Sequence, residues 1–238
     1  MMKRFIHIPL MLCFAFLTAS CIKDDSQEWG SFDLALSADL LIETAVKAPE
    51  PLPETDYSDY TIMLYRDGSL LWETTFDEFT ADAGNTYKRV PAGEYVVYVE
   101  NCNAQEAEVG NGRARYAGSG EFTVTAGRTA TATVVCRMIN AKVTLAYGAD
   151  FLSHFNPSGL SVSDLNGRKV ALDMEKLSDS HENAEVLYFN VTDDGTAALT
   201  YTLVAGDLYL NKVMRYDVSF IVEKCMWNKV NMTKEEDA

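Results

Sequence analysis

The sequence predicts an all-β protein with two consecutive antiparallel β-sandwich domains behind an N-terminal leader. Apolar and polar residues alternate with a period of two over many short segments, which is typical of strands with one buried face. Gly, Asn and Asp separate these segments, and no long amphipathic helix interrupts them. Many short strands with turn residues between them are typical of antiparallel sandwiches.

The N-terminus predicts a secretory signal peptide. Lys3 and Arg4 form a short basic start, an apolar stretch runs from Phe5 to Ala19, and small residues end it, as in such leaders. A membrane-spanning helix is the alternative, but it needs about 20 apolar residues. The stretch here is shorter and contains His7 and Pro9. We therefore expect the leader to be cleaved.

Cys21 is the predicted lipidation site. It directly follows the small residues of the leader, where the cysteine of a bacterial lipoprotein accepts diacylglycerol. Stable anchoring needs more than one acyl chain, and a triacylated cysteine meets that condition. An ordinary signal peptide followed by a chance cysteine is the alternative, since Thr18 stands where Leu is usual.

Lys23, Asp24 and Asp25 follow this cysteine closely. A lysine with two acids resembles the export signal of surface lipoproteins in the Bacteroidota. We expect the mature protein at the outer membrane, lipid-anchored and facing the cell exterior.

The composition is strongly acidic, with 35 acidic against 20 basic residues and a formal net charge of −15. A surface of this sign repels nucleic acid and anionic headgroups. The charge therefore argues against binding to DNA, RNA or phospholipid.

Cys102, Cys136 and Cys225 are widely spaced and form no C-x-x-C pair, which argues against a zinc site. Two interpretations stay open. The three are buried thiols that behave as small apolar residues, or Cys102 and Cys136 form a disulfide, which an oxidising exterior allows.

The expected strands follow one another along the chain. Phe32, Leu34, Leu36 and Ala38 share the first apolar face, and three prolines at 49, 51 and 53 mark a stiff linker or loop. Asp67-Gly68 is a hairpin signal between two strands. Further strands are expected at Tyr60–Tyr65, Leu70–Trp72, Glu94–Glu100, Phe122–Val124, Arg128–Met138, Glu185–Val191, Leu199–Val204 and Met214–Val222, with one helical turn in Leu172–Leu177.

A change of apolar phase marks the expected domain boundary. Apolar residues occupy even positions up to Met138 and odd positions from Ile139 onward. A slip of one residue turns every side chain to the other face, as where a strand leaves one sheet for another; a bulge within one domain is the alternative. The predicted divisions are a signal peptide (1–20), a lipidated tether (21–30), two transthyretin-like or immunoglobulin-like sandwiches (31–138 and 139–232) and a charged, frayed tail (233–238).

No motif of catalysis is evident. His154 and His181, the histidines beyond the leader, have no metal-binding spacing, and Gly118-Ser119-Gly120 lacks the strand-turn-helix setting of a nucleophilic serine. We expect neither an enzyme nor a cofactor or metal. The polar, Gly-rich segment Asn101–Gly120 is expected to be a long loop, and Tyr116 in it is the candidate for an exposed ligand contact.

With these features placed, the chain resembles a group of Bacteroidota lipoproteins that look like relatives of the fimbrillins. The resemblance covers most of the mature chain. The strand and turn motifs that carry it are Gly30-Ser31-Phe32-Asp33-Leu34, Pro91-Ala92-Gly93-Glu94-Tyr95, Tyr116–Val124, Ala126-Gly127-Arg128-Thr129, Cys136 and Ala141-Lys142-Val143-Thr144.

The resemblance implies an adhesion-like β-sandwich lipoprotein. In fimbrillins a protease removes an N-terminal segment, and a strand of the next subunit fills the groove, which is strand addition to an open edge. Fimbrillins are typically cut after a basic residue. Here no Arg lies between Cys21 and Arg66, and Lys47 is the basic residue in the expected region. By this hypothesis, cleavage after Lys47 releases the strand Phe32–Ala38.

The sequence therefore favours a non-catalytic surface lipoprotein with a binding or adhesive role, as an accessory or tip subunit of a fimbria. Its expected partners are the outer membrane, through the lipid, and pilin-like subunits or a host or glycan ligand. The alternative is a glycan-binding accessory lipoprotein of an outer-membrane uptake system, which needs an exposed Trp or Tyr platform.

Overall fold

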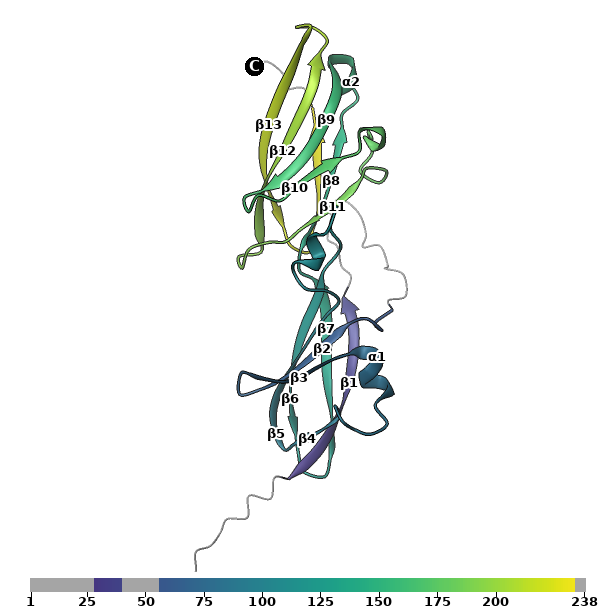
Figure 1. Cartoon of the computed structure of the whole chain (residues 1–238), viewed down its shortest axis with the longest axis vertical. Helices are drawn as coiled ribbons and strands as arrows, with labels where there is room; N and C mark the ends of the chain where they lie inside the picture. Colours follow the sequence, from purple (N-terminus) through teal and green to yellow (C-terminus); the bar gives the residue numbers. More distant parts are fainter. Residues whose placement is uncertain (1–27, 40–55, 234–238) are drawn as a thin grey trace, which may run out of the picture.

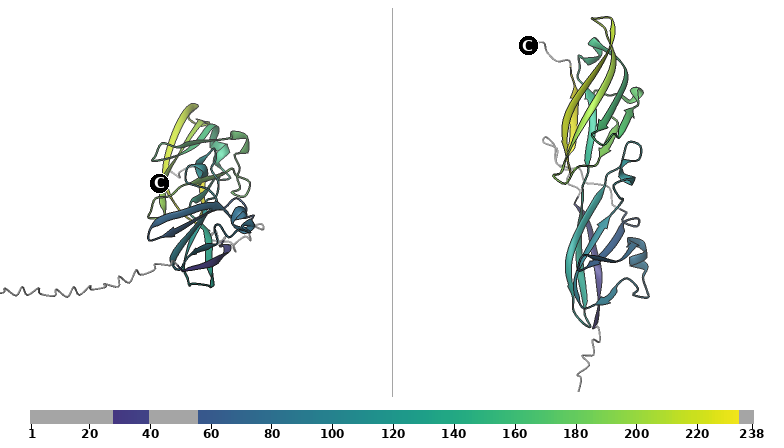
Figure 2. Two further views of the ribbon diagram at one scale, coloured as in Figure 1. Left: turned by 60° about the horizontal axis from the view of Figure 1, so that its bottom comes forward. Right: turned by 60° about the vertical axis from the view of Figure 1, so that its left-hand side comes forward.

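The computed structural model describes residues 28–39 and 56–233, which form two β-rich units placed end to end (Figures 1 and 2). Strands dominate both units, so the predicted all-β class is confirmed. None of the helices in these two ranges has the length and apolarity that crossing a bilayer requires.

The N-terminal unit is built on a single curled sheet. Its strand order is β3-β2-β5-β6-β7-β1-β4. The Phe32 ring on β1 lies 6.2 Å from the Trp72 ring on β3, centroid to centroid, although four strands separate β1 from β3 in that order. The sheet therefore folds over itself around one core. Its elements are β1 (Trp29–Asp39), β2 (Thr61–Arg66), β3 (Ser69–Thr75), α1 (Phe76–Ala81), β4 (Arg89–Pro91), β5 (Gly93–Glu100), η1 (Glu106–Glu108), β6 (Tyr116–Val124) and β7 (Thr129–Met138).

The C-terminal unit is a sandwich of two sheets. A four-stranded sheet has the order β10-β9-β12-β13, and a three-stranded sheet the order β11-β8-β14. Both sheets contribute side chains to one buried cluster, among them Leu203 of β12 and Phe189 of β11. Its elements are β8 (Ala141–Tyr147), α2 (Phe151–His154), β9 (Phe155–Asp164), β10 (Lys169–Leu172), η2 (Met174–Lys176), β11 (Val186–Phe189), β12 (Thr196–Asp207), β13 (Lys212–Glu223) and β14 (Trp227–Met232).

One strand pairing in each unit is parallel, whereas the sequence predicted antiparallel sandwiches. β1 runs parallel to β7 over Ser31–Asp39, and β14 runs parallel to β8 over Trp227–Met232. Parallel neighbours require a long connection, and in each unit the chain passes through several other elements between the two strands. Apolar and polar residues alternate with a period of two in parallel and antiparallel strands alike, so the pattern does not reveal the direction of pairing.

The change of apolar phase coincides with the passage between two separate cores. Cys136, at the end of β7, belongs to the N-terminal core, and Val143 of β8 belongs to the C-terminal core. Between them Asn140 is 1% exposed. Asn140 thus lies between the two cores, and the domain bounds drawn at Met138–Asn140 stay a prediction.

The helix α1 was not predicted. Its N-cap Thr75 accepts a hydrogen bond from the Glu78 backbone N–H, and the Glu78 side chain accepts one from the Thr75 N–H, which together form a capping box. Phe79 is buried against Phe32. The helical turn expected within Leu172–Leu177 is confirmed as η2.

Candidate functional site

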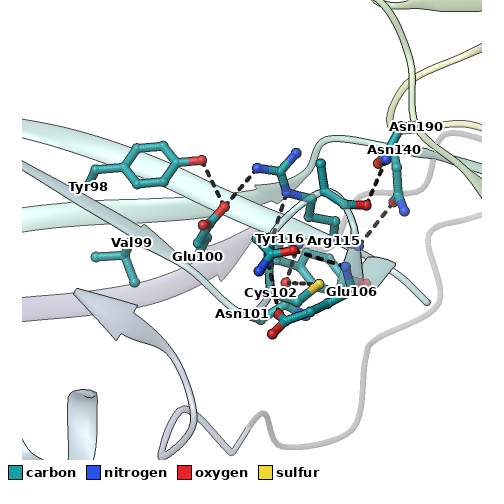
Figure 3. A network of polar contacts seen from close by, with 12 residues as sticks. Tyr98, Val99, Glu100, Asn101, Cys102, Glu106, Arg115, Tyr116, Asn140 and Asn190 are labelled. Atoms are coloured by element: carbon teal, nitrogen blue, oxygen red, sulfur yellow. Dashed lines mark hydrogen bonds and ion pairs between the residues drawn. The ribbon is translucent and has the colours of Figure 1, made fainter. Parts of the chain in front are cut away.

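The side chain of Asn140 organises the junction between the units. Its Oδ1 accepts the backbone N–H of Arg115 at 3.1 Å, and its Nδ2 donates to the Arg113 carbonyl at 2.8 Å. Its own carbonyl accepts the Cys225 N–H at 3.2 Å. A buried amide costs stability unless it is hydrogen-bonded, and here two partners satisfy the side-chain amide and a third satisfies the backbone carbonyl. Figure 3 shows the site.

The segment 101–115, which we call the interdomain clasp, reaches from the N-terminal unit onto the C-terminal one. The Asn111 carbonyl accepts the Tyr188 N–H at 2.8 Å, and Asn111 Nδ2 donates to Glu185 Oε1 at 2.7 Å. Asn190 Nδ2 donates to the Ala104 carbonyl at 2.9 Å. The clasp therefore extends the hydrogen bonding of β11 and fixes one unit against the other.

Gly112 allows the clasp to approach β11 closely. Its φ is +81°, and a Cβ there would lie 2.5 Å from the Tyr188 carbonyl oxygen and 2.9 Å from that of Ala107. Only glycine both adopts this positive φ without strain and, because it lacks a Cβ, leaves room for the two carbonyl oxygens. The Gly-rich composition, from which a long loop was predicted, reflects this contact between the units.

Tyr116 is the first residue of β6 rather than part of a loop. Its side chain is half-buried and packs against the N-terminal core. Burial raises the pKa of its hydroxyl to about 12. Its backbone N–H donates to Asn101 Oδ1 at 2.8 Å. A ligand contact at Tyr116 stays a prediction.

No disulfide joins Cys102, Cys136 and Cys225 in the described part of the chain. Cys102 and Cys136 are buried thiols, and burial raises the pKa of both, that of Cys136 to about 12. Cys225 Sγ donates to the Met138 carbonyl at the junction. The three cysteines therefore have packing and junction roles.

The histidines serve local structure. His181 contacts Thr144 Oγ1 and Asn231 Oδ1, both at 3.0 Å. His154 lies 2.9 Å from Ser153 Oγ, but that hydroxyl donates to the Asp150 carbonyl at 2.6 Å. The serine is therefore held as part of a turn.

The β12–β13 turn and α2 lie at the end of the C-terminal unit farthest from the start of β1 (Figure 1), and both carry exposed apolar side chains. Tyr209 and Val213 are 73% and 74% exposed. The Tyr209 ring stacks on His154 of α2, with centroids 4.8 Å apart. The exposed side chains that form this distal surface are Leu152, Leu208, Tyr209, Leu210 and Val213.

Local hydrogen bonds shape the β12–β13 turn. Asp207 Oδ1 accepts the N–H groups of Tyr209 and Leu210 at 2.9 and 2.8 Å, and the Leu208 N–H donates to the His154 carbonyl. The turn is thereby tied to α2, and its apolar side chains point away from the core. Three apolar residues in a row at a turn, where polar residues are usual, were the signal that sequence reasoning missed.

β13 leaves a long open edge beside this surface. Among the described strands it is the last of its sheet and pairs with β12 alone over Lys212–Glu223. An open edge offers backbone groups to a further strand. Ile221 on this strand is 71% exposed.

Five of the predicted site residues lie outside the described residues. These are Cys21, Lys23, Asp24, Asp25 and Lys47. Lipidation, export and cleavage at these positions stay predictions.

Residues 28–238 match the protein family described as Domain of unknown function (DUF4493). This match confirms the predicted membership of an uncharacterised domain family. A comparison with curated proteins found no match.

Three solved structures of bacterial proteins match most of this chain, each with a TM-score below 0.5. A candidate cell adhesion protein from Bacteroides eggerthii shares 8% identity over 88% of this chain and 87% of its own, with a TM-score of 0.44. The fimbrial anchor protein Mfa2 from Porphyromonas gingivalis shares 11% over 79% of this chain and 82% of its own, with a TM-score of 0.40. The TIE protein of Bacillus anthracis shares 10% over 87% of this chain, with a TM-score of 0.31, and this chain spans 34% of its length.

Proposed function

This chain belongs to the DUF4493 family, and we propose that it is a non-catalytic lipoprotein of the cell surface that binds a partner through the distal surface. The observation that carries the proposal is the gathering of exposed Leu, Tyr and Val side chains at one end of an otherwise acidic protein. Contiguous apolar patches on soluble proteins mark interaction sites.

The position of the distal surface supports an adhesive role. The lipidated Cys21 would precede β1, which starts at the opposite end of the molecule (Figure 1). The two units lie end to end, and the interdomain clasp connects them. The length of both units thus separates the apolar side chains from the anchored end, where a host surface or a pilin-like subunit can reach them.

Adhesion of whole cells tests the proposal. Cells that display the full chain should adhere several-fold better to wells coated with mucin or fibronectin than cells that lack it. The variant Tyr209→Ser/Leu210→Ser should lose this gain. Leu165→Ser is the matched control, because Leu165 is 84% exposed but belongs to the β9–β10 turn. Equal adhesion by the double variant and the wild type would overturn the proposal.

Glycan binding is the second candidate, and the stacking of Tyr209 on His154 favours it. A flat, exposed aromatic ring, held by a second ring, is the platform that the alternative reading of the sequence requires. On a glycan array Tyr209→Ala should abolish binding, and Tyr209→Phe should retain it. An array without any signal would rule out this candidate.

A further inference from the structure

The end of the molecule opposite the distal surface carries an exposed aromatic and cationic cluster. Trp29 is 44% exposed, and the Arg89 guanidinium lies 5.5 Å from the centre of its ring. Arg128, in the β6–β7 turn, is also exposed. Together with Asn85 these residues form what we call the proximal surface. It surrounds a shallow hollow of about 310 Å³, which Ser31 and Thr129 also line.

The local backbone holds this cluster firmly. The Trp29 carbonyl accepts the Gly127 N–H at 2.8 Å, and the Arg128 carbonyl accepts the Ser31 N–H at 3.0 Å. At Gly30 a Cβ would lie 2.5 Å from the Thr125 carbonyl oxygen. The start of β1 and the β6–β7 turn are therefore packed together, and Trp29 and Arg128 keep fixed relative positions.

The two arginines lack counter-charges within the described ranges. Neither Arg89 nor Arg128 forms an ion pair with the residues of 28–39 and 56–233. Glu28 precedes Trp29 in the chain and is exposed. The described ranges thus place no carboxylate in an ion pair with either guanidinium group, although the chain has 35 acidic residues. Arginine binds phosphate through paired N–H groups, and tryptophan favours the boundary between lipid and water.

We propose that the proximal surface docks on the phosphate-bearing headgroups of the membrane that holds the lipid anchor. This inference rests on the lipidation of Cys21 in the proposed function. Cys21 lies eight residues before Trp29, a separation that an extended chain spans in about 30 Å at most. A tether of this length holds the proximal surface near the headgroups at an effective concentration in the millimolar range. Even a weak contact between them is then populated.

Charge makes the docking directional. The acidic protein as a whole is repelled by an anionic surface, as the composition indicates. The proximal surface, with Arg89 and Arg128, is attracted to it. The protein therefore meets the membrane by this end, and the distal surface is directed outward.

Tryptophan fluorescence tests the docking in the full, lipidated protein. The protein is placed in vesicles of phosphatidylcholine and phosphatidylglycerol, with bromine on the acyl chains near the headgroup. The chain contains three tryptophans, and Trp29 is the one at the proximal surface. Bromine should quench the wild type more than Trp29→Phe, and the difference reports Trp29 alone. Vesicles of phosphatidylcholine only should give a smaller difference.

Arginine variants identify the cause. Arg89→Gln/Arg128→Gln should lose most of the Trp29 quenching. The control Arg113→Gln/Arg215→Gln removes the same charge from exposed sites elsewhere and should keep the Trp29 quenching.

Flotation with the vesicles distinguishes failure of the lipid anchor from failure of the docking. A protein that floats without Trp29 quenching, or equal quenching in both double variants, overturns the docking. A protein that does not float overturns the lipid anchor and the docking that depends on it.

Discussion

Arg115 Nη2 lies 2.8 Å from Glu100 Oε2, and the two side chains are only 21% and 12% exposed. The Tyr98 hydroxyl donates to the same carboxylate oxygen, and Arg115 Nε donates to the Cys102 carbonyl at 3.1 Å (Figure 3). Burial alone would lower the pKa of Arg115, but the hydrogen bond and charge of Glu100 outweigh it, so the pKa is raised. The ion pair ties the end of the clasp to β5.

Glu100→Gln should lower the free energy of unfolding by about 2 kcal/mol, because a largely buried guanidinium loses its counter-charge. Urea unfolding measures the change. Glu106→Gln is the control, since the Glu106–Arg113 pair is more than half exposed and such pairs contribute below about 1 kcal/mol. An equal loss of unfolding free energy in the two variants would show that burial of the Glu100–Arg115 pair does not add to stability.

Gly112→Ala should detach the clasp from β11. The new Cβ meets the Tyr188 carbonyl in a backbone conformation with positive φ, and such strain costs about 1–3 kcal/mol. Hydrogen exchange of the Tyr188 N–H, which donates to Asn111, should become faster.

Gly110→Ala is the matched control for this experiment. Gly110 also has positive φ, at +60°, but nothing lies within 4 Å of a Cβ there. The variant Gly110→Ala should therefore have the strain of a positive φ without a steric clash between its Cβ and another atom. Unchanged exchange at Tyr188 in Gly112→Ala would mean that the clasp does not depend on this close approach.

The strands were predictable because each carries its own local pattern. Asp67-Gly68 with alternating residues on both sides indicated the β2–β3 hairpin, and the shift of phase after Met138 lies between the last strand of one core and the first strand of the other. Both signals arise from residues close together in the chain. The parallel pairing of β1 with β7 was not predictable. It joins the first and the last strand of the N-terminal unit, which are far apart in the sequence.

The two surfaces were harder to foresee for different reasons. The distal surface had a local signal, the run Leu208-Tyr209-Leu210 at a turn. The proximal surface had none, because Trp29, Arg89 and Arg128 come from three distant segments and meet only in the folded unit. The segment that forms the clasp was predicted only as a long loop, because the composition does not reveal that Gly112 allows a close contact between the units.

The thiols of Cys102 and Cys136 should be unreactive toward alkylating reagents in the folded protein. Burial raises the pKa of both Cys102 and Cys136, and the thiolate is the reactive form. Iodoacetamide at pH 8 should therefore leave both unmodified until guanidinium unfolds the chain. Peptide mapping by mass spectrometry gives the modified fraction of each. A peptide pair linked by a Cys102–Cys136 disulfide would contradict the structure.

Cleavage after Lys47 is the sharpest test of polymerisation by strand exchange. Trypsin should cut the folded protein there, and Lys47→Gln should prevent the cut. The segment containing β1 should remain bound after cleavage, because the Phe32 ring is fully buried against Phe79 and Phe122 at 5.5 and 4.7 Å. Protection of Lys47 in the folded wild type would refute this route.

The fate of the cut protein decides whether β1 is exchanged. Phe32→Ala removes the largest contact of β1, which costs about 3–5 kcal/mol for a buried phenylalanine, and the cut segment should then dissociate within the purification. If strands are exchanged as in the hypothesis, β1 should leave the cut wild type only slowly, and the groove beside β7 should then accept a strand from a neighbouring copy. Ladders of oligomers on a native gel should therefore form from cut wild-type protein and not from Lys47→Gln, and a cut protein that stays monomeric would exclude polymerisation through β1.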